Sequence, residues 1–484
     1  MKTTLTSPDP ASPHYSSGRA NAAAPINAHN VHAHVRTIDM HNDNVERIVV
    51  RIAGWPREVL MRLLVSACFS AGSFASLPAQ TIPVRQMDPP TASTFAPLGL
   101  FLGVKQLSDG RVFVDDAQRL RLLLFDSTLT NVAVIADTTG KAAFNYGDNP
   151  GRFTSYVGDS SLFFEQSSQT LLVLDAFGHV ARITVAPKPT DIKGLPATMF
   201  NADAQGRLVY RGSLPRLPAA PVPFGDKRFI MRQSDSAPLV RADFDSRHVD
   251  TLAWLKMPKA TAFIGTLRSD GSYAYDENRI TPLSSIDEWT QTADGSIAIV
   301  RGLDYHMDWI APDGRRRSTP KMPFDWIRVT DDDKRRLSDS ARVAADKLIT
   351  EMQKRAPASA PSRPGSLKMT IRVSATDGSL TAFSQTGKNV VVPLSEIPDY
   401  WPPVRFGSVA ADLDGNVWIL PTSAVQRAGG GIVYDVVNRS GQLFERVQML
   451  PDRSIAGFGP NGIIYLRRRD SALVWHLEKS RVHR

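Results

Sequence analysis

The chain has 484 residues, of which 42% are hydrophobic and 22% charged, so it is long and apolar enough to fold around a large core. Its formal net charge is +9, but Lys and Arg are scattered along the sequence, and we expect no nucleic-acid partner. The single cysteine, Cys68, excludes an internal disulfide and a thiolate metal cluster.

An export signal is predicted near the N-terminus. Met61 and Arg62 are followed by a short run of apolar and small residues that ends in Leu-Pro-Ala. A basic start, an apolar stretch and a small residue at the cut are typical of a secretory signal peptide. The sequence predicts a signal peptide over 61–79, cleaved between Ala79 and Gln80, and a periplasmic or secreted protein.

The residues around this signal carry little periodicity. Residues 1–60 are rich in Ala, Asn, Ser, Pro and His, and we interpret them as an extension that is either disordered or untranslated, with translation starting at Met61. The alternative is a disordered arm on a cytoplasmic protein, followed by a buried apolar segment. Residues 80–94 are interpreted as a linker. No later apolar run has the roughly 20 residues that a transmembrane helix needs.

From about residue 95 onward, a short hairpin motif recurs. Each copy has a few apolar residues, a turn with Asp, Asn or Gly, and a second strand rich in β-branched or aromatic residues. The six copies lie at 104–115, 156–165, 200–210, 289–300, 409–420 and 455–466. Further strand-and-turn segments follow at 120–126, 171–178, 307–314 and 432–441. The repeating unit is therefore a four-stranded meander of about 45–50 residues, which is typical of propeller blades.

These repeats predict an all-β fold, a six-bladed β-propeller of four-stranded antiparallel blades over residues 95–484. Seven blades is the rival count, because the repeat is faint between residues 210 and 290. The repeat is also interrupted by one predicted helix at about 331–355, whose apolar residues recur at helical spacing. These are Leu337, Ala341, Ala344, Leu348 and Met352. We expect an insertion of helix and linker over 330–366, with the apolar stripe against the propeller or a partner.

Two stretches carry a resemblance to a known group. FGSVAADLDGNVWI at 406–419 is similar to the repeat of NHL-type propellers, and DGRVFVDDAQRLRLLLFD at 109–126 resembles the same unit. The chain from about residue 95 resembles the broad TolB-like and NHL-like group of six-bladed propellers, which includes many exported bacterial proteins. The resemblance implies a fold and no particular reaction. Related gluconolactonase-like hydrolases hold a divalent ion in the channel, but their ligands cannot be matched residue by residue here.

Common catalytic motifs are missing: the sequence has no HExxH, GxSxG or GxxxxGK[ST]. The richest polar cluster is Asp304, His306 and Asp308. Imidazole and carboxylates at this spacing could act as a general base or bind a divalent ion. On a strand, however, residues two apart share a face, so the cluster could equally be a solvated group on a blade surface.

A second candidate lies in YWPPVR at 400–405, just before the best blade motif. Loops that enter the innermost strand lie at the mouth of a propeller's channel. Trp401 and Arg405 could therefore stack on and pair with an aromatic or anionic group. The alternative is that Trp401 covers the core.

The sequence thus predicts an exported, monomeric binding or scaffold module for a protein, glycan or small ligand, with no cofactor and no catalysis inferred. The alternative is a metal-dependent hydrolase or lyase with a divalent cation, such as calcium, in the central channel.

Overall fold

The computed structural model describes the residues of one unit, Gln80–Arg484, with gaps. The described residues are 82–166, 168–188, 200–215, 220–221, 228–231, 234–258, 263–267, 269, 273–355, 370–373, 380–382, 388–426 and 431–482. The predicted extension, the signal peptide and the cleavage position between Ala79 and Gln80 lie outside them. Among the described residues, no helix is long and apolar enough to cross a membrane.

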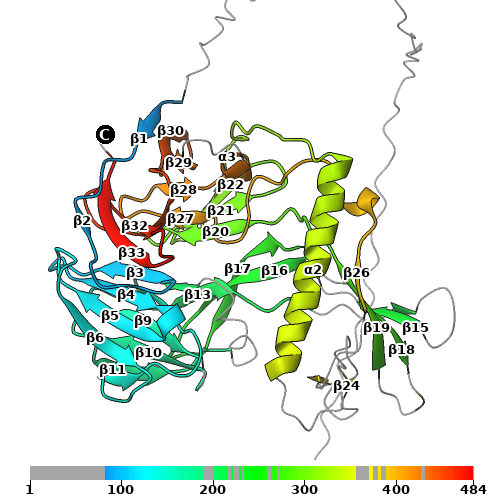
Figure 1. The fold of residues 1–484 in the computed structure, drawn as a ribbon, viewed down its shortest axis with the longest axis horizontal. Helices are drawn as coiled ribbons and strands as arrows, with labels where there is room; N and C mark the ends of the chain where they lie inside the picture. The colour runs from blue at the N-terminus through cyan, green and yellow to red at the C-terminus, as the bar shows by residue number, and fades with distance from the viewer. Residues whose placement is uncertain are drawn as a thin grey trace, which may run out of the picture. The chain divides into compact units, whose positions relative to one another are not determined.

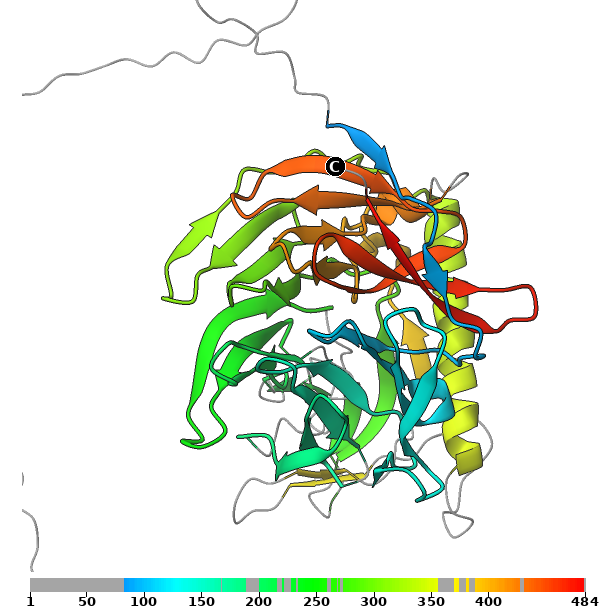
Figure 2. The same cartoon turned by 90° about the vertical axis from the view of Figure 1, so that its left-hand side faces the viewer.

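Six antiparallel sheets follow one another round a ring (Figure 2). Blade 1 has β3 (Gly103–Gln106), β4 (Val112–Asp116), β5 (Arg121–Phe125), β6 (Val132–Asp137) and the short β7 (Phe144–Asn145). Blade 2 has β8 (Arg152–Ser155), β9 (Ser161–Glu165), β10 (Thr170–Leu174) and β11 (Val180–Thr184). Blade 3 has β12 (Phe200–Ala202), β13 (Leu208–Arg211), β16 (Ser236–Ala242) and β17 (Val249–Lys256).

The second half of the ring repeats this plan. Blade 4 has β20 (Glu288–Gln291), β21 (Ile297–Arg301), β22 (His306–Ile310) and β23 (Arg316–Ser318). Blade 5 has β27 (Val409–Ala411), β28 (Val417–Ile419), β29 (Val433–Val437) and β30 (Leu443–Gln448). Blade 6 has β31 (Arg453–Phe458), β32 (Ile463–Arg469) and β33 (Trp475–Arg481). Each predicted hairpin falls in the inner strand pair of one blade, although the copy at 156–165 covers only β9 and the turn before it, and the prediction of six blades is confirmed.

The N-terminal segment closes the ring. β2 (Ala92–Ser93) pairs antiparallel with β33 and supplies the fourth strand of blade 6, while β1 (Val84–Gln86) adds parallel to β30 of blade 5. Residues 80–94, predicted as a linker, thus contain two strands. They have no alternating apolar pattern because their pairing depends on backbone hydrogen bonds to edges formed by the distant C-terminal strands.

A seventh sheet lies outside the ring. It has the order β14 (Ala220–Pro221), β15 (Arg228–Met231), β18 (Phe263–Leu267), β19 (Tyr273–Ile280), β24 (Thr370–Val373) and β25 (Leu380–Ala382), with β26 (Lys388–Val391) beside β19. Its strands come from three insertions, between β13 and β16, between β17 and β20, and between β23 and β27. These insertions explain why the blade repeat is faint between residues 210 and 290.

All three insertions leave the ring from the same end of the blades. First strands of neighbouring blades contact one another, as β3 does with β8 and β31 and as β20 does with β27, so these strands are innermost. Because strands alternate in direction within each antiparallel blade, every first strand starts, and every second strand ends, on one face. We call this the insertion face, since both the seventh sheet and helix α2 (Asp331–Arg355) branch from it. Figure 1 shows α2, β15, β18, β19 and β26 to one side of the blades.

Each neighbouring pair of blades buries one hydrophobic cluster. Between blades 1 and 2, for example, Phe113, Phe153 and Phe163 pack together, with the Phe113 and Phe153 ring centroids 5.5 Å apart. Between blades 4 and 5 the cluster contains Tyr305 and Val404. The alternation of apolar residues along the strands supplies both faces of every blade, which is why the ring has a continuous core.

The predicted helix is confirmed as α2. Thr330 caps it, because its Oγ1 accepts from the Asp333 backbone N–H (3.2 Å) while its own N–H donates to Asp333 Oδ2 (3.0 Å). Of the predicted apolar stripe, Leu337 and Ala341 are half-buried and Ala344 is exposed. Buried Lys334 ties the first turn to the rest of the unit through an ion pair with Asp399 (2.7 Å).

Candidate functional site

The two predicted groups lie on the insertion face of blades 4 and 5. Asp304 is in the turn between β21 and β22, whereas Trp401 and Arg405 are in the segment that leads into β27. The two segments border the same core cluster, which contains Tyr305 and Val404. Among the described residues, no hydrogen bond or ion pair joins the two groups, so they form separate candidates.

The first group is a network of ion pairs. His306 Nδ1 lies 2.5 Å from Asp304 Oδ1, and its Nε2 lies 3.5 Å from Asp308 Oδ1. Asp308 also accepts hydrogen bonds from Arg301 Nε (2.7 Å) and from the hydroxyl of Ser318. The alternation along β22 places His306 and Asp308 on one face, as the sequence predicts.

The charges in this network compensate one another. Burial raises the pKa of Asp308, but hydrogen bonds from Ser318 and Arg301 and the charge of Arg301 outweigh burial, and the pKa lies below its usual value. The same balance lowers the pKa of Asp304, where His306 and Lys321 outweigh burial. Among the described residues, no group of three or more His, Cys, Asp or Glu side chains could hold a metal ion. The network joins the ends of β21, β22 and β23, and its role as a site stays a prediction.

The second group is an ordered entry segment. The backbone N–H of Trp401 donates to the carbonyl of Ile327 (3.0 Å), and the backbone N–H of Val329 donates to the carbonyl of Asp399 (2.8 Å). Residues 399–401 therefore pair with the segment before α2. Trp401 is half-buried. Arg405 is exposed and its backbone N–H donates to Ser408 Oγ (3.2 Å). This leaves the Arg405 guanidinium on the insertion face.

A chain of aromatic rings runs beside this segment from the core to the surface. We call it the aromatic ladder: Tyr305, Phe324, Trp326 and Tyr400. Successive ring centroids lie 5.2, 4.9 and 6.4 Å apart. Its inner end is fully buried, whereas Trp326 and Tyr400 are 44% and 50% exposed.

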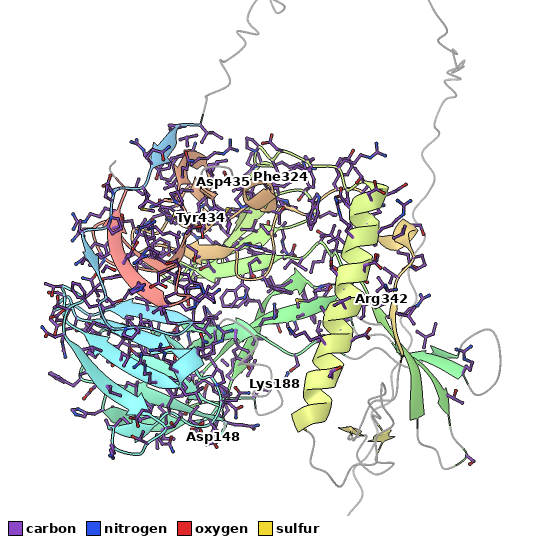
Figure 3. All side chains as sticks on the ribbon, viewed as in Figure 1. Asp148, Lys188, Phe324, Arg342, Tyr434 and Asp435 are labelled. Atoms are coloured by element: carbon purple, nitrogen blue, oxygen red, sulfur yellow. The ribbon has the colours of Figure 1, made fainter. Side chains whose placement is uncertain are left out.

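The inner end of the ladder is fixed by blade 5. Tyr305 has φ +56°, a left-handed conformation that turns its ring into the core, and its hydroxyl donates to buried Asp435 (2.7 Å). Figure 3 labels Phe324, Tyr434 and Asp435, which lie close together in the upper part of the view. The exposed rings are therefore held on a rigid support.

Buried charges at the starts of the innermost strands were missed by sequence reasoning. Glu288, the first residue of β20, accepts from the Gly407 backbone N–H (2.7 Å) and so links blades 4 and 5. Burial raises the pKa of Glu288 above its usual value. Backbone hydrogen bonds from Gly407 and Trp289 and the charge of Arg211 offset only part of this rise. Arg211 itself lies over the exposed Phe406 ring, 4.8 Å from its centroid.

A similar group lies between blades 1 and 2. Asp115 is fully buried and accepts a hydrogen bond from Tyr146 (2.5 Å). Burial raises the pKa of Asp115 to about 7, opposed by the hydrogen bond from Tyr146 and by the charge of Arg152. Carboxylates at one end of an apolar strand were the available signal, but the sequence alone does not show which strand ends are buried.

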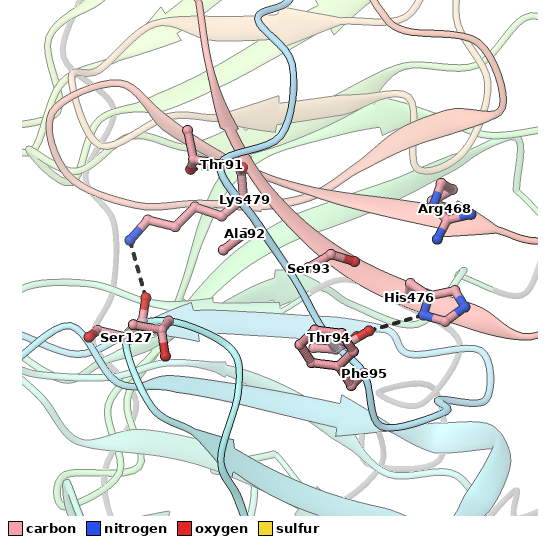
Figure 4. A pocket seen from close by; sticks show the side chains of 10 residues that line it. Thr91, Ala92, Ser93, Thr94, Phe95, Ser127, Arg468, His476 and Lys479 are labelled. Atoms are coloured by element: carbon pink, nitrogen blue, oxygen red, sulfur yellow. Dashed lines mark hydrogen bonds between the residues drawn. The ribbon is translucent and has the colours of Figure 1, made fainter.

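A hollow of about 600 Å³ lies where β2 meets β33 (Figure 4). Its basic side chains already have partners. Arg468 pairs with Glu478 (2.6 Å), His476 lies 2.9 Å from Asp470, and Lys479 donates to the Ser127 carbonyl (3.4 Å). This hollow therefore offers a ligand little unsatisfied charge.

Comparisons with known proteins found fold-level likeness. No family model and no curated protein matches the chain. A putative exported protein from Bacteroides fragilis is similar over 84% of this chain and 100% of that one, with 9% identity and a TM-score of 0.35.

Two further structures match comparably. A calcium-binding protein, regucalcin, from Agrobacterium tumefaciens is similar over 83% of this chain and 97% of its own length, with 10% identity and a TM-score of 0.31. A virginiamycin B lyase from Staphylococcus aureus is similar over 80% of this chain and 99% of its own length, with 11% identity and a TM-score of 0.30. Likeness at this level assigns no ligand or reaction. The strand order itself identifies the chain as a six-bladed β-propeller.

Proposed function

We propose that the chain is an exported β-propeller that acts as a binding module and holds a protein partner on its insertion face. The observation that carries this proposal is the aromatic ladder, whose outer rings Trp326 and Tyr400 are exposed while its inner ring is locked in the core. Exposed Trp and Tyr on a rigid support are the residues that dominate protein–protein interfaces. Export rests on the predicted signal peptide at 61–79.

Helix α2 extends the same surface. It starts five residues after Trp326, and most of its described side chains are exposed. Its exposed residues include both acidic and basic side chains, as expected for the polar rim around an aromatic centre.

The test compares two variants of the exposed ladder rings with one control variant at another exposed ring. Trp326→Ala and Tyr400→Ala should each lower the retention of an envelope protein from the host by tenfold or more, since a central aromatic residue contributes about 2 kcal/mol or more. Trp254→Ala, which removes an exposed Trp (52%) from the outermost strand of blade 3, is the control and should retain the same protein.

The outcomes separate the classes of partner. Equal retention by all variants would refute the role of the ladder. A retained component that survives protease but not periodate would show that the partner is a glycan, and would contradict the proposal of a protein partner.

A further inference from the structure

A second hollow opens on the insertion face between blades 5 and 6. It has a volume of about 690 Å³ and is formed by residues 431–432, 450–454, 467, 469–470 and 475. This volume lies within the range of about 300–1,000 Å³ typical of small-ligand sites. We call it the Arg467 pocket. None of the residues that form it belongs to the aromatic ladder.

Three arginines line this pocket, and two of them are engaged. Arg453 pairs with the buried carboxylate of Glu478 (2.7 Å). Arg469 lies over the Trp475 ring, 5.4 Å from its centroid, and its Nε donates to the Leu473 carbonyl (3.3 Å).

Arg467 differs from both. Its Nε is buried and has no hydrogen-bond partner among the described residues. The guanidinium lies 5.7 Å from the Phe101 ring centroid, an apolar neighbour, and no ion pair joins it to a carboxylate in the described part of the chain. The Arg467 side chain is half-buried, and a partly desolvated cation without a counter-charge is costly because its desolvation is not repaid by an ion pair.

The surroundings increase this cost. Burial lowers the pKa of Arg467; Tyr434 opposes this shift, and the nearby positive charge of Arg152 adds to it. The acidic residues of the pocket are Asp452, which is exposed, and Asp470, which already accepts from His476 and from the Val474 backbone N–H (2.9 Å). Within the described part of the chain, the pocket thus presents a cation without a counter-charge.

We propose that the Arg467 pocket binds the carboxylate or phosphate group of a small organic anion, with Arg467 as its main charged contact. A guanidinium matches both groups through paired N–H donors. Trp475 and Ser454 at the wall of the pocket offer a flat ring and a hydroxyl to the remainder of the ligand.

The test measures thermal unfolding of the full chain with and without inorganic phosphate, and separately with glucuronate, at constant ionic strength. Binding to the folded state raises Tm in proportion to occupancy. We expect one of the two anions to raise the Tm of the wild type, and its identity separates a phosphate site from a carboxylate site. Arg467→Met should have a higher Tm in the absence of the anion and show no anion-dependent rise.

Two further variants complete the design. Arg315→Met removes an exposed arginine from the turn on the opposite face and should keep the full anion-dependent rise. Arg467→Lys keeps the positive charge and should fold even if Arg467→Met does not, with anion affinity reduced about tenfold because paired donation is lost. No rise in the wild type, or an equal rise in wild type and Arg467→Lys, would overturn the proposal.

Discussion

At the scale of single residues, the most informative groups are charges buried near the blade ends. Asp115 is fully buried on β4 and, although Tyr146 donates to it, one of its oxygens has no hydrogen-bond partner among the described residues. Burial is the largest cause of its raised pKa of about 7. Folding therefore favours the protonated carboxyl.

This predicts an unusual pH dependence for Asp115. Because its pKa is higher in the folded state than in the unfolded state, its contribution to stability is fully present below about pH 4 and is lost as the pH rises through about 7. Asp115→Asn should therefore gain stability relative to the wild type over this range, on the order of a few kcal/mol. Urea unfolding at pH 4.5 and pH 8 measures the difference. The same difference at both pH values would contradict the assignment.

The sequence predicted features of single residues that depend on the local chain, but not those that depend on distant segments. The spacing of His306 and Asp308 placed them on one face because strand alternation is local. Their role as a site stays a prediction, as does that of Trp401 and Arg405. The uncompensated charge of Arg467 could not be found in the sequence, because it depends on Phe101 and Arg152 in other blades.

At the scale of elements, α2 is the clearest local structure, and its cap can be tested. Thr330→Ala removes the side chain that accepts from the Asp333 N–H. A lost cap of this kind costs about 1 kcal/mol, so amides in the first turn of α2 should exchange roughly fivefold faster. Blade amides, for example those of β21, serve as the internal control. Unchanged exchange in α2 would show that Lys334 and Asp399, rather than the cap, hold its first turn.

The elements found from sequence are those whose signals are local. Hairpins with Asp-Gly or Asn-Gly turns and the 25-residue helix were predicted because turn chemistry and periodicity lie within each segment. The seventh sheet was missed because its strands come from three insertions far apart in the chain. For instance, the register of β26 beside β19 pairs Lys388 with Glu277, which no local pattern encodes.

At the scale of the whole molecule, the fold follows from repetition and its closure from the N-terminal segment. Six similar meanders bury six clusters between neighbours, so the period alone predicted the ring. The closing strand β2 has only two residues and pairs Ala92 with Lys479. These two residues lie far apart in the sequence and meet only when the ring is closed, so the pairing can be seen only in the structure.

Native mass spectrometry of the protein from its own host, fraction by fraction, tests whether this is an exported propeller that binds its partner without transforming it. We expect a chain that begins at Gln80, in the envelope or medium, carrying a non-covalent partner or organic anion that is released intact on denaturation. A full-length chain in the cytoplasm, or a chain that carries one divalent ion and loses a hydrolase or lyase activity on chelation, would contradict the account.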